Sequence, residues 1–393
     1  MKYLKVYNGK IITRAGILPG GTLLIADGRI AAVSGHDIEV PGAELVDAGG
    51  RYIAPGFIDL HVHGGGGADF MDNTVDAFLQ IAQTHARYGT TAMMPTTLSC
   101  GMDSLLTTLS VYEQAKLVNQ SGAEFIGLHI EGPYFAMSQR GAQDPRYIHP
   151  PDPAEYQAVL SRSAAVKRWS AAPELPGAIE FGRYLQERDI LPAIAHTDAV
   201  YEEVVPAFAA GYTHCTHFYS AMSGVSRRNA FRYAGVIEAA YLMEEMTVEI
   251  IADGVHLPIP LLQLIYKIKG RDKTALITDA MRAAALPPGP SVLGSLQDGM
   301  PVLVEDGVAK LPDRSAFAGS VATCDRLIRT MLTAGIPLYD AVMMMSETPA
   351  TIMKVQERKG SLTPGKDADV VIFDENIHIH TTIVGGNIVY NGQ

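Results

Sequence analysis

The regular alternation of short apolar runs with longer amphipathic stretches, through the middle of this 393-residue chain, constrains the fold most strongly. Such alternation predicts βα units whose strands run parallel to one another. The amphipathic stretches include residues 75–88, 104–119, 179–188 and 235–245. We count eight candidate strands, at 57–63, 90–95, 125–131, 168–172, 191–196, 212–217, 247–252 and 274–279.

Eight βα units within about 250 residues predict an α/β fold of the TIM (β/α)8 barrel type. Periodicity alone does not show that a sheet closes on itself, so a doubly wound open sheet is the alternative. Hydrophobic residues make up 47% of the chain. That share and the chain length allow one large domain of the barrel type and a smaller second one.

The two ends of the chain are β-rich, unlike the middle. The runs 22–26 and 29–33 flank Asp27-Gly28, a pair that favours a hairpin turn. Residues 369–374 and 382–390 are also strand-like. We therefore predict a small, discontinuous β-sandwich domain built from both termini. It comprises residues 1–54 plus 357–393, the barrel comprises 55–356, and an inserted hairpin is expected at 302–311.

Composition narrows the partners and the compartment. The formal net charge of -11 argues against a nucleic-acid partner and against an anionic membrane surface. No apolar run is long enough to span a bilayer, and the N-terminus lacks the apolar core of a signal peptide. Three cysteines, far apart and odd in number, argue against a disulfide framework. A reducing, cytoplasmic location is expected.

The first candidate strand carries the first indication of chemistry. It ends in His61 and His63, which four glycines follow at 64–67. Side chains alternate along a strand, so these two imidazoles lie on one face and could share a metal ion. An isolated His-x-His would more often be a buried, hydrogen-bonded pair, so this motif alone does not decide.

Further polar residues stand at the ends of four other candidate strands: Glu131, His196, His217 and Asp279. Barrel enzymes place their chemistry at the carboxyl ends of the strands. Each residue alone could be an ordinary hydrogen-bonding group. Six such residues at one face of an apolar core are better explained by one shared site than by six separate hydrogen bonds. Four histidines and two carboxylates together indicate a catalytic metal site of the zinc type.

Nine short motifs follow one another along the chain: PGFIDLHVHG (55–64), GLHIEGPY (127–134), APE (172–174), AHTDA (195–199), THFYSAM (216–222), IADGVH (251–256), ITDAM (277–281), AGS (318–320) and PGKDAD (364–369). Their order and spacing resemble the amidohydrolase superfamily and, within it, the N-acetylglucosamine-6-phosphate deacetylase family. The resemblance extends from end to end.

The resemblance implies a divalent metal cofactor of one or two ions, with zinc or iron as the metal. Glu131, His196 and His217 would hold the principal ion. His61 and His63 could hold a second ion bridged by Glu131. Asp279 would be the catalytic acid and base, which takes a proton from water and returns it to the departing amine.

The resemblance also implies substrate-binding residues. His256 would contact the sugar and help to polarise the acetyl carbonyl, and Ala142 and Gln143 are further candidates. Gln143 stands where many relatives have histidine, but its amide can still donate a hydrogen bond to a sugar hydroxyl.

The sugar phosphate would be held by Ser220, Ala221 and Arg228, the arginine coming from a neighbouring subunit. The active form would then be a homodimer or a higher homo-oligomer. Ser220 stands where many relatives have asparagine, so this chain departs from the family pattern at the phosphate site.

The implied reaction converts N-acetylglucosamine 6-phosphate, a small-molecule amino-sugar phosphate, to glucosamine 6-phosphate and acetate. Within the same class, N-acetylgalactosamine 6-phosphate or another N-acyl substrate is an alternative. A different class is a catalytically silent amidohydrolase-like scaffold. Such scaffolds typically lose metal ligands or the aspartate of strand eight, and this chain keeps both.

Overall fold

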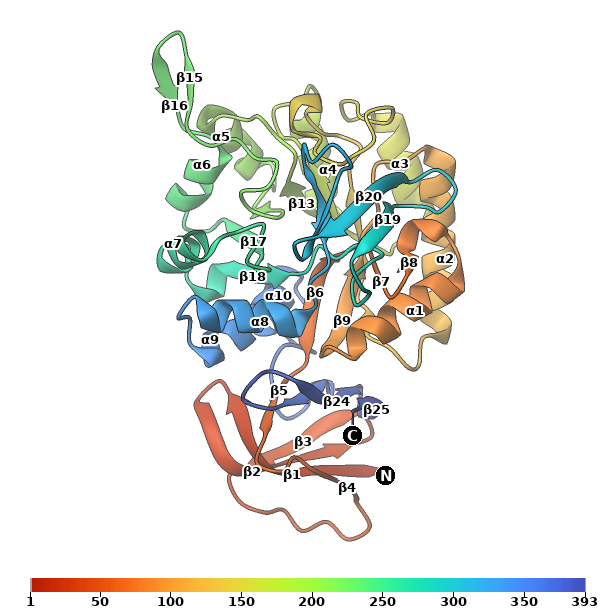
Figure 1. Cartoon of the computed structure of the whole chain (residues 1–393), viewed down its shortest axis with the longest axis vertical. Coiled ribbons are helices and arrows are strands. Elements are labelled where there is room, and N and C mark those ends of the chain that lie inside the picture. Colours follow the sequence, from red (N-terminus) through yellow and green to blue (C-terminus); the bar gives the residue numbers. More distant parts are fainter. Residues whose placement is uncertain (1, 393) are drawn as a thin grey trace.

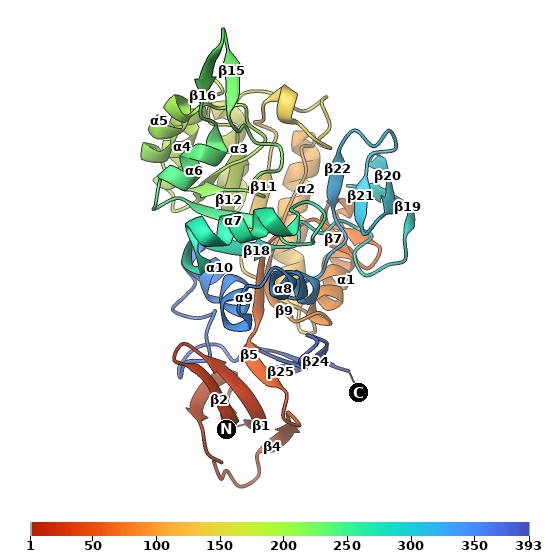
Figure 2. The ribbon, with the colours of Figure 1, turned by 60° about the vertical axis from the view of Figure 1, so that its left-hand side comes forward.

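The computed structural model describes residues 2–392, which form a β-rich base below a larger α/β body (Figures 1 and 2). The central strands of the body pair in parallel, in chain order, within two sheets. Every residue of the strands at 57–62, 90–95 and 274–277 is buried, which explains their continuous apolar pattern. The strands are β6 (Phe57–Val62), β9 (Thr90–Pro95), β10 (Glu124–Phe125), β11 (Leu128–Glu131), β12 (Val166–Ala171), β13 (Leu191–Ile194), β14 (His214–Cys215), β17 (Thr247–Ile251) and β18 (Thr274–Ile277).

The two parallel sheets meet at both of their edges. Isolated parallel bridges join Thr96 to His129 and Val62 to Ala280. The end of β6 therefore lies beside the segment that follows β18, although more than 200 residues separate them in the chain. All eight predicted strand regions are confirmed, and the region at 125–131 is split into β10 and β11.

Helices cover the outside of these strands (Figures 1 and 2). The four predicted helices are confirmed within two or three residues at each end. Thr74 caps the first of them, because its side chain accepts a hydrogen bond from the backbone N–H of Ala77. The helices are α1 (Val75–Ala86), α2 (Met102–Val118), α3 (Pro153–Arg162), α4 (Ala178–Gln186), α5 (Tyr201–Ala209), α6 (Val236–Leu242), α7 (Ile259–Lys269), α8 (Cys324–Thr333), α9 (Leu338–Met344) and α10 (Glu347–Ile352), with short 3-10 turns at Phe70–Asp72, Met137–Gln139 and Arg271–Lys273.

Both chain ends contribute to the base, as predicted, but its strands pair as one mixed sheet and not as the two sheets of a sandwich. The reason lies in the long first strand, which shifts register on both sides of Gly9. Its first half pairs with β4 and its second half with β5, so one strand continues through both parts. The strands are β1 (Tyr3–Thr13), β2 (Gly16–Ala26), β3 (Arg29–Ser34), β4 (Glu44–Asp47), β5 (Tyr52–Pro55), β23 (Val370–Phe373), β24 (Ile379–Val384) and β25 (Asn387–Asn391).

Two insertions extend from the body. The predicted hairpin at 302–311 is confirmed and is part of a four-stranded antiparallel sheet. A separate two-stranded hairpin projects beyond the rest of the molecule (Figure 1). Within residues 2–392, no helix combines the length and apolarity needed to cross a membrane. The inserted strands are β19 (Gly289–Leu293), β20 (Met300–Glu305), β21 (Val308–Lys310) and β22 (Phe317–Ser320), the projecting pair is β15 (Ser226–Arg228) and β16 (Phe231–Tyr233), and β7 (Gly64–Gly65) pairs with β8 (Ala68–Asp69).

A buried ion cluster joins the base to the body. The Lys359 ammonium is almost fully buried and lies 2.6 Å from both Glu124, on β10, and Asp369, just before β23. We expect Lys359→Met to lower the free energy of unfolding by about 3–5 kcal/mol, because it leaves the buried Asp369 carboxylate without its cation. Urea denaturation measures this loss. Lys310→Met, at an exposed ion pair with Asp306, is the control and should change stability little.

Candidate active site with two metal-binding groups

A cavity of about 210 Å³ lies at the carboxyl ends of the parallel strands. Most of the predicted site residues line it, although they come from distant parts of the chain. The inserted sheet closes one side, which the sequence analysis did not foresee. The lining residues are His63, Leu98, Glu131, Gly141, Ala142, Gln143, His196, His217, Ser220, Ala221, His256, Asp279, Leu293, Ala316, Phe317 and Gly319.

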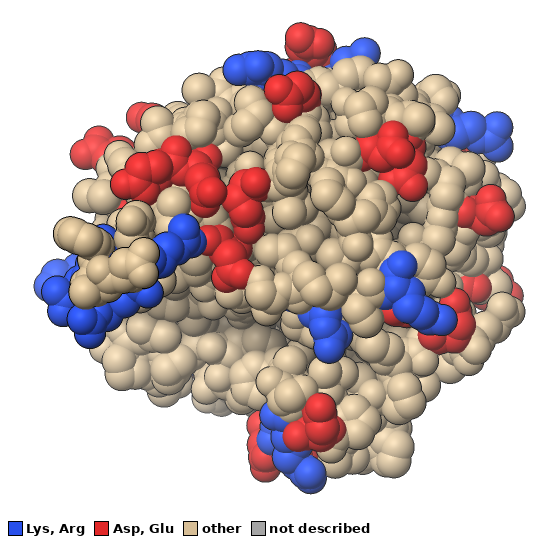
Figure 3. Space-filling model, turned by 90° about the horizontal axis from the view of Figure 1, so that it is seen from above, with Lys and Arg blue, Asp and Glu red and all other residues tan. Residues whose placement is uncertain are grey.

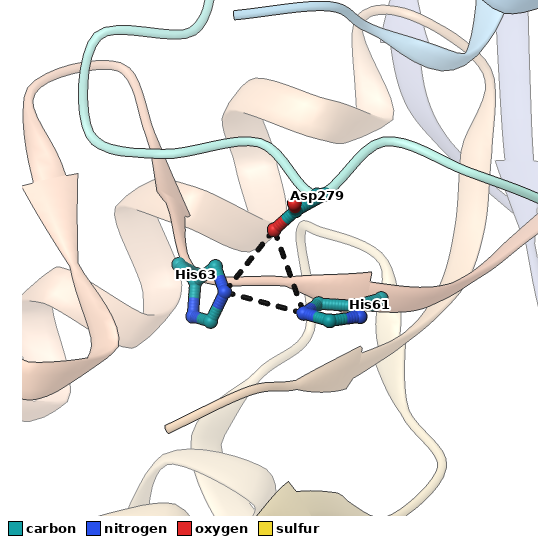
Figure 4. Close-up of side chains that lie close together, drawn as sticks. All are labelled: His61, His63 and Asp279. Carbon is teal, nitrogen blue, oxygen red and sulfur yellow. Dashed lines mark hydrogen bonds and ion pairs between the residues drawn. The ribbon is translucent and has the colours of Figure 1, made fainter. Parts of the chain in front are cut away.

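His61, His63 and Asp279 form the first of two groups whose donor atoms are close enough to share a metal ion (Figure 4). The Nε2 atoms of the two histidines are 3.2 Å apart. Asp279 Oδ1 lies 3.2 Å from His63 Nε2 and 3.5 Å from His61 Nε2. The two histidines therefore point to one side of β6, as strand alternation predicts, and the carboxylate that follows β18 meets them there.

Glu131, His196 and His217 form the second group. Glu131 Oε1 lies 3.0 Å from His217 Nε2 and 3.4 Å from His196 Nε2. The two imidazole Nε2 atoms are 3.2 Å apart. All three side chains are largely buried, and they line the cavity.

Glu131 lies between the two groups. Its Oε1 is 3.5 Å from His61 Nε2 and its Oε2 is 3.4 Å from His63 Nε2. Burial alone would raise the pKa of Glu131, but the facing imidazoles of His61, His196 and His217 hold it well below its usual range. Glu131 is therefore a carboxylate at neutral pH, in a position to bridge two ions.

The orientation of the four imidazoles fits metal binding. In each ring, Nδ1 faces an oxygen acceptor and so carries a proton, which leaves Nε2 as the atom that can bind a metal ion when it is unprotonated. Neutral Nε2 atoms together with buried carboxylates are the donor set of a divalent transition metal. The Nδ1 partners are Glu249 for His61 (3.0 Å), the Thr96 carbonyl for His63 (3.2 Å), the Gln139 carbonyl for His196 (2.8 Å) and the Ser220 carbonyl for His217 (3.1 Å).

Three of the six predicted residues have strained backbones. His196, His217 and Asp279 adopt φ values of 46°, 28° and 48°, in the left-handed region that side chains other than glycine disfavour. Each such residue costs on the order of 1–3 kcal/mol, and such strain collects at functional sites. It also ends the strands early, which explains why all three lie just beyond β13, β14 and β18 and not within them.

The first group is also strongly charged. Burial alone would lower the pKa of His63, but its hydrogen bond to Asp279 and the charges of Glu131 and Asp279 raise it to about 9. Burial alone would raise the pKa of Asp279, but His61 and His63 hold it below its usual range. A metal ion at this group must therefore displace a proton from His63 at neutral pH.

Asp59 holds this part of the site together from below. It is completely buried and accepts hydrogen bonds from the Thr278 hydroxyl (2.5 Å), the Thr278 N–H (3.2 Å) and the His61 N–H (3.3 Å). Burial raises its pKa to about 6. These contacts connect the strand that carries His61 to the residue before Asp279, so they fix the two ends of the first group relative to each other.

His256 also lines the cavity. Its Nδ1 and its backbone N–H both lie 2.8 Å from the Asp253 carboxylate, and its ring packs against Phe317. A carboxylate only accepts, so Nδ1 is protonated and Nε2 is left for a ligand. Asp253 in the Asp-Gly-Val-His motif thus orients the predicted substrate-binding histidine.

Gln143 contacts Glu131 in this structure. Its amide nitrogen donates to Glu131 Oε2 at 2.8 Å, and its amide oxygen accepts from the Ser99 N–H at 2.9 Å. It lines the cavity, but two of its hydrogen-bonding positions are already used. Ala142 lines the cavity beside it.

The residues predicted to bind the sugar phosphate lie in two different places. Ser220 and Ala221 line the cavity, and the Ser220 carbonyl orients His217. Arg228 lies outside the cavity, on the projecting β15–β16 hairpin, where its guanidinium is over the Tyr233 ring. Within one chain, the structure does not bring Arg228 to the metal-binding groups.

Sequence reasoning missed a charged pair beneath the site. Arg168, on β12, and Glu249, on β17, are completely buried and joined by hydrogen bonds of 2.5 and 2.6 Å. Burial alone would raise the pKa of Glu249, but Arg168 and hydrogen bonds from His214 and His61 hold it well below its usual range. The sequence did contain a sign of this pair, because Arg168 and Glu249 each stand among the apolar residues of a predicted strand.

Comparisons with known proteins show the family. Residues 52–389 match the model of the amidohydrolase family. An N-acetylglucosamine-6-phosphate deacetylase from Lysinibacillus sphaericus is 33% identical over 92% of this chain and 91% of its own. An N-acetylgalactosamine-6-phosphate deacetylase from Escherichia coli O157:H7 is 31% identical over 96% of this chain and 97% of its own.

Solved structures agree as well. A variant N-acetyl-D-glucosamine-6-phosphate deacetylase from Mycobacterium smegmatis, in complex with N-acetyl-D-glucosamine-6-phosphate, superposes with a TM-score of 0.90 at 28% identity, and both chains are covered completely. The N-acetylglucosamine-6-phosphate deacetylase from Pasteurella multocida gives a TM-score of 0.92 at 26% identity and covers 99% of this chain and 100% of its own. This chain therefore belongs to the amidohydrolase family, and it is a metal-dependent hydrolase of carbon–nitrogen bonds.

Proposed function

We propose that this protein removes the acetyl group from N-acetylglucosamine 6-phosphate, which yields glucosamine 6-phosphate and acetate. The proposal rests mainly on the position of Glu131, which lies between two groups of metal-binding side chains in a single cavity. Relatives with that named activity match nearly the whole chain. The scaffold alternative is disfavoured because both groups and Asp279 are retained and aligned.

Each group would hold one divalent ion, with zinc preferred and iron as the alternative, since imidazole and carboxylate ligands suit both. Glu131, His196 and His217 would hold the principal ion, and His61 and His63 the second. When bound, such an ion lowers the pKa of water and polarises a carbonyl oxygen.

Asp279 has the position and the charge for proton transfer. Its Oδ1 faces both histidines of the first group, and its pKa is held low, so it is ionised at neutral pH and has room for a proton. In the reaction, water attacks the acetyl carbon, its proton passes to Asp279, and the carbon–nitrogen bond breaks. Asp279 returns that proton to the nitrogen, so the products are a neutral amine and acetic acid, which ionises in water.

His256 would also orient the substrate, because it lines the same cavity. With Nδ1 held by Asp253, its Nε2 is free to contact the sugar and the acetyl group. Ala142 and Gln143 would complete the sugar pocket beside it. Gln143 would then have one remaining N–H for the substrate, because the other already binds Glu131.

The galactosamine epimer is a second candidate, because a relative with that named activity is nearly as similar to this chain. The test is acetate release from both 6-phosphorylated N-acetyl hexosamines, from unphosphorylated N-acetylglucosamine and from an unrelated N-acyl amino acid. The proposal expects the highest kcat/KM with N-acetylglucosamine 6-phosphate. A higher value with the galactosamine compound would select the alternative.

The phosphate would be bound by Ser220, Ala221 and Arg228, and Arg228 would come from a second copy of the chain. The β15–β16 hairpin supports this, because its arginines are exposed and it projects beyond the rest of the molecule (Figure 1). Figure 3 shows basic side chains gathered at the edge of the upper face, where the hairpin projects. Such a hairpin can reach a neighbour only in a homodimer or a higher homo-oligomer.

Arg228→Ala should raise KM for the phosphorylated sugar by roughly ten- to a hundredfold, with little change for the unphosphorylated sugar. A charge-assisted hydrogen bond to an anion is worth about 1.5–3 kcal/mol. Steady-state kinetics on both sugars measures the difference. Arg227→Ala is the matched control, because neighbouring strand residues point to opposite faces. Equal losses on both sugars would reject the phosphate role.

The shared site can be tested by complementation. Co-expression of Arg228→Ala chains with Asp279→Asn chains should restore part of the activity, because a mixed dimer contains one site with both side chains intact. Purified mixed dimers without any recovery would place Arg228 outside the partner's site.

We also propose that the parallel strands form one closed TIM-type barrel over residues 55–356, with residues 1–54 and 357–393 as a separate small domain. The bridges Thr96–His129 and Val62–Ala280 support closure at both sheet edges. We propose a cytoplasmic location, in keeping with three free cysteines.

A further inference from the structure

A buried polar network lies directly beneath the metal-binding groups. Its centre is the Arg168–Glu249 ion pair, in which Nη1 and Nη2 of the guanidinium each donate to a different carboxylate oxygen. Arg168 also donates to the Thr216 hydroxyl at 2.7 Å. Two parallel hydrogen bonds from a rigid guanidinium fix the plane of the carboxylate as well as its position.

Glu249 contacts both metal-binding groups through one oxygen. Its Oε1 lies 3.0 Å from His61 Nδ1 and accepts from the His217 backbone N–H at 3.2 Å. Its Oε2 lies 3.3 Å from His214 Nε2. Because an ionised carboxylate has no proton to donate, the hydrogen bond to His61 exists only when Nδ1 carries the ring proton.

We propose that Glu249, held in place by Arg168, is a positioning residue that keeps the proton of His61 on Nδ1 and so leaves Nε2 free for a metal ion. The inference rests on the proposed metal site of His61, His63 and Asp279. It extends that site to two residues on β12 and β17 that have no contact with the cavity. The Glu249 carboxylate also contacts the second group, through the backbone N–H of His217.

The alternative is that the ion pair only stabilises the barrel interior. Two double variants separate these roles. Arg168→Met with Glu249→Leu removes both charges and leaves His61 Nδ1 without an acceptor. Arg168→Met with Glu249→Gln also removes both charges but keeps a carbonyl oxygen that can accept from Nδ1. Replacing the whole pair avoids an unpaired buried charge, which would unfold the protein more readily.

Zn²⁺ titration against a fluorescent chelator measures the two binding steps, and His63→Asn identifies the step that belongs to the first group. We expect the leucine double variant to bind the second Zn²⁺ ten- to a hundredfold more weakly, the usual effect of losing a partner of a metal-binding histidine. The glutamine double variant should stay within a few-fold of the parent. Equal affinity in the leucine variant and the parent would overturn the inference.

Asp369→Asn is the matched control. It disturbs another buried carboxylate with a cationic partner, Lys359, at the junction with the base and away from the cavity. It should lower stability and leave both Zn²⁺ affinities unchanged. If it weakens the second step as much as the leucine variant does, the effect is one of stability and the positioning role is rejected.

The tautomer itself can be measured on the metal-free parent protein. In ¹⁵N-histidine-labelled protein, the two ring nitrogens of His61, assigned by comparison with His61→Gln, should show a protonated Nδ1 and an unprotonated Nε2. A neutral ring with its proton on Nε2 and none on Nδ1 would overturn the inference even if the leucine variant fails to fold. If the parent protein binds only one Zn²⁺, the second metal ion of the proposed function is rejected. The ¹⁵N measurement of His61 then tests the role of Glu249 by itself.

Discussion

Asp279→Asn should lower turnover by about 10²–10⁴-fold, the usual contribution of a positioned acid and base. The amide keeps the shape of the side chain and one oxygen toward His61 and His63, but it cannot accept a proton from water. The principal ion, held by other residues, should stay bound. Acetate release at saturating substrate measures the loss, and metal analysis of the same sample shows whether binding is preserved.

The matched control for this variant is Asp325→Asn. Asp325 is also a buried carboxylate, paired with Arg329 on α8, and it does not line the cavity. It should keep near-parental turnover once it is folded. Near-parental turnover in Asp279→Asn would mean that another group moves the proton.

Glu131→Gln should remove tightly bound metal and reduce activity at least as far as Asp279→Asn does. Glu131 lies within 3.5 Å of the Nε2 atoms of four histidines, so its charge holds the donor set together. Metal analysis after gel filtration should show well under one ion per chain. Part of the activity should return when excess Zn²⁺ is added, because the imidazoles remain.

Glu174→Gln is the control for that experiment. Glu174 lies just after β12, in the Ala-Pro-Glu motif, and holds the loop after His196 through Thr197 and Asp198. Its amide variant should retain one ion or more per chain. Full metal content in Glu131→Gln would contradict the assignment of the principal site.

The positions of the parallel strands could be predicted because buried strands leave continuous apolar runs in the sequence. The architecture of the base could not, since register and pairing depend on contacts between distant segments. The register shifts around Gly9 allow β1 to pair with β4 and β5 in turn, and no local pattern reports that pairing.

The candidate site was predictable for a similar reason. His61, His63, Glu131, His196 and His217 each interrupt or end an apolar run, so they are visible one strand at a time. Their supports were not visible, because a carbonyl that orients an imidazole leaves no mark on residue type. Arg168 and Glu249 are 81 residues apart, and only the folded chain shows that each neutralises the other.

Gln143 shows the limit of reading a residue by its place in a motif. Its spacing indicated a sugar contact, but the structure places its amide against Glu131 and Ser99. Whether it also contacts the sugar stays a prediction.

We propose above that one metal-dependent site deacetylates a phosphorylated amino sugar. The most direct measurement is acetate release from N-acetylglucosamine 6-phosphate by protein of known metal content, before and after chelation and after Zn²⁺ is restored. We expect turnover with at least one ion per chain, loss of turnover on chelation and recovery with Zn²⁺. Full turnover by metal-free protein, or no acetate release by the metal-loaded protein, would contradict it.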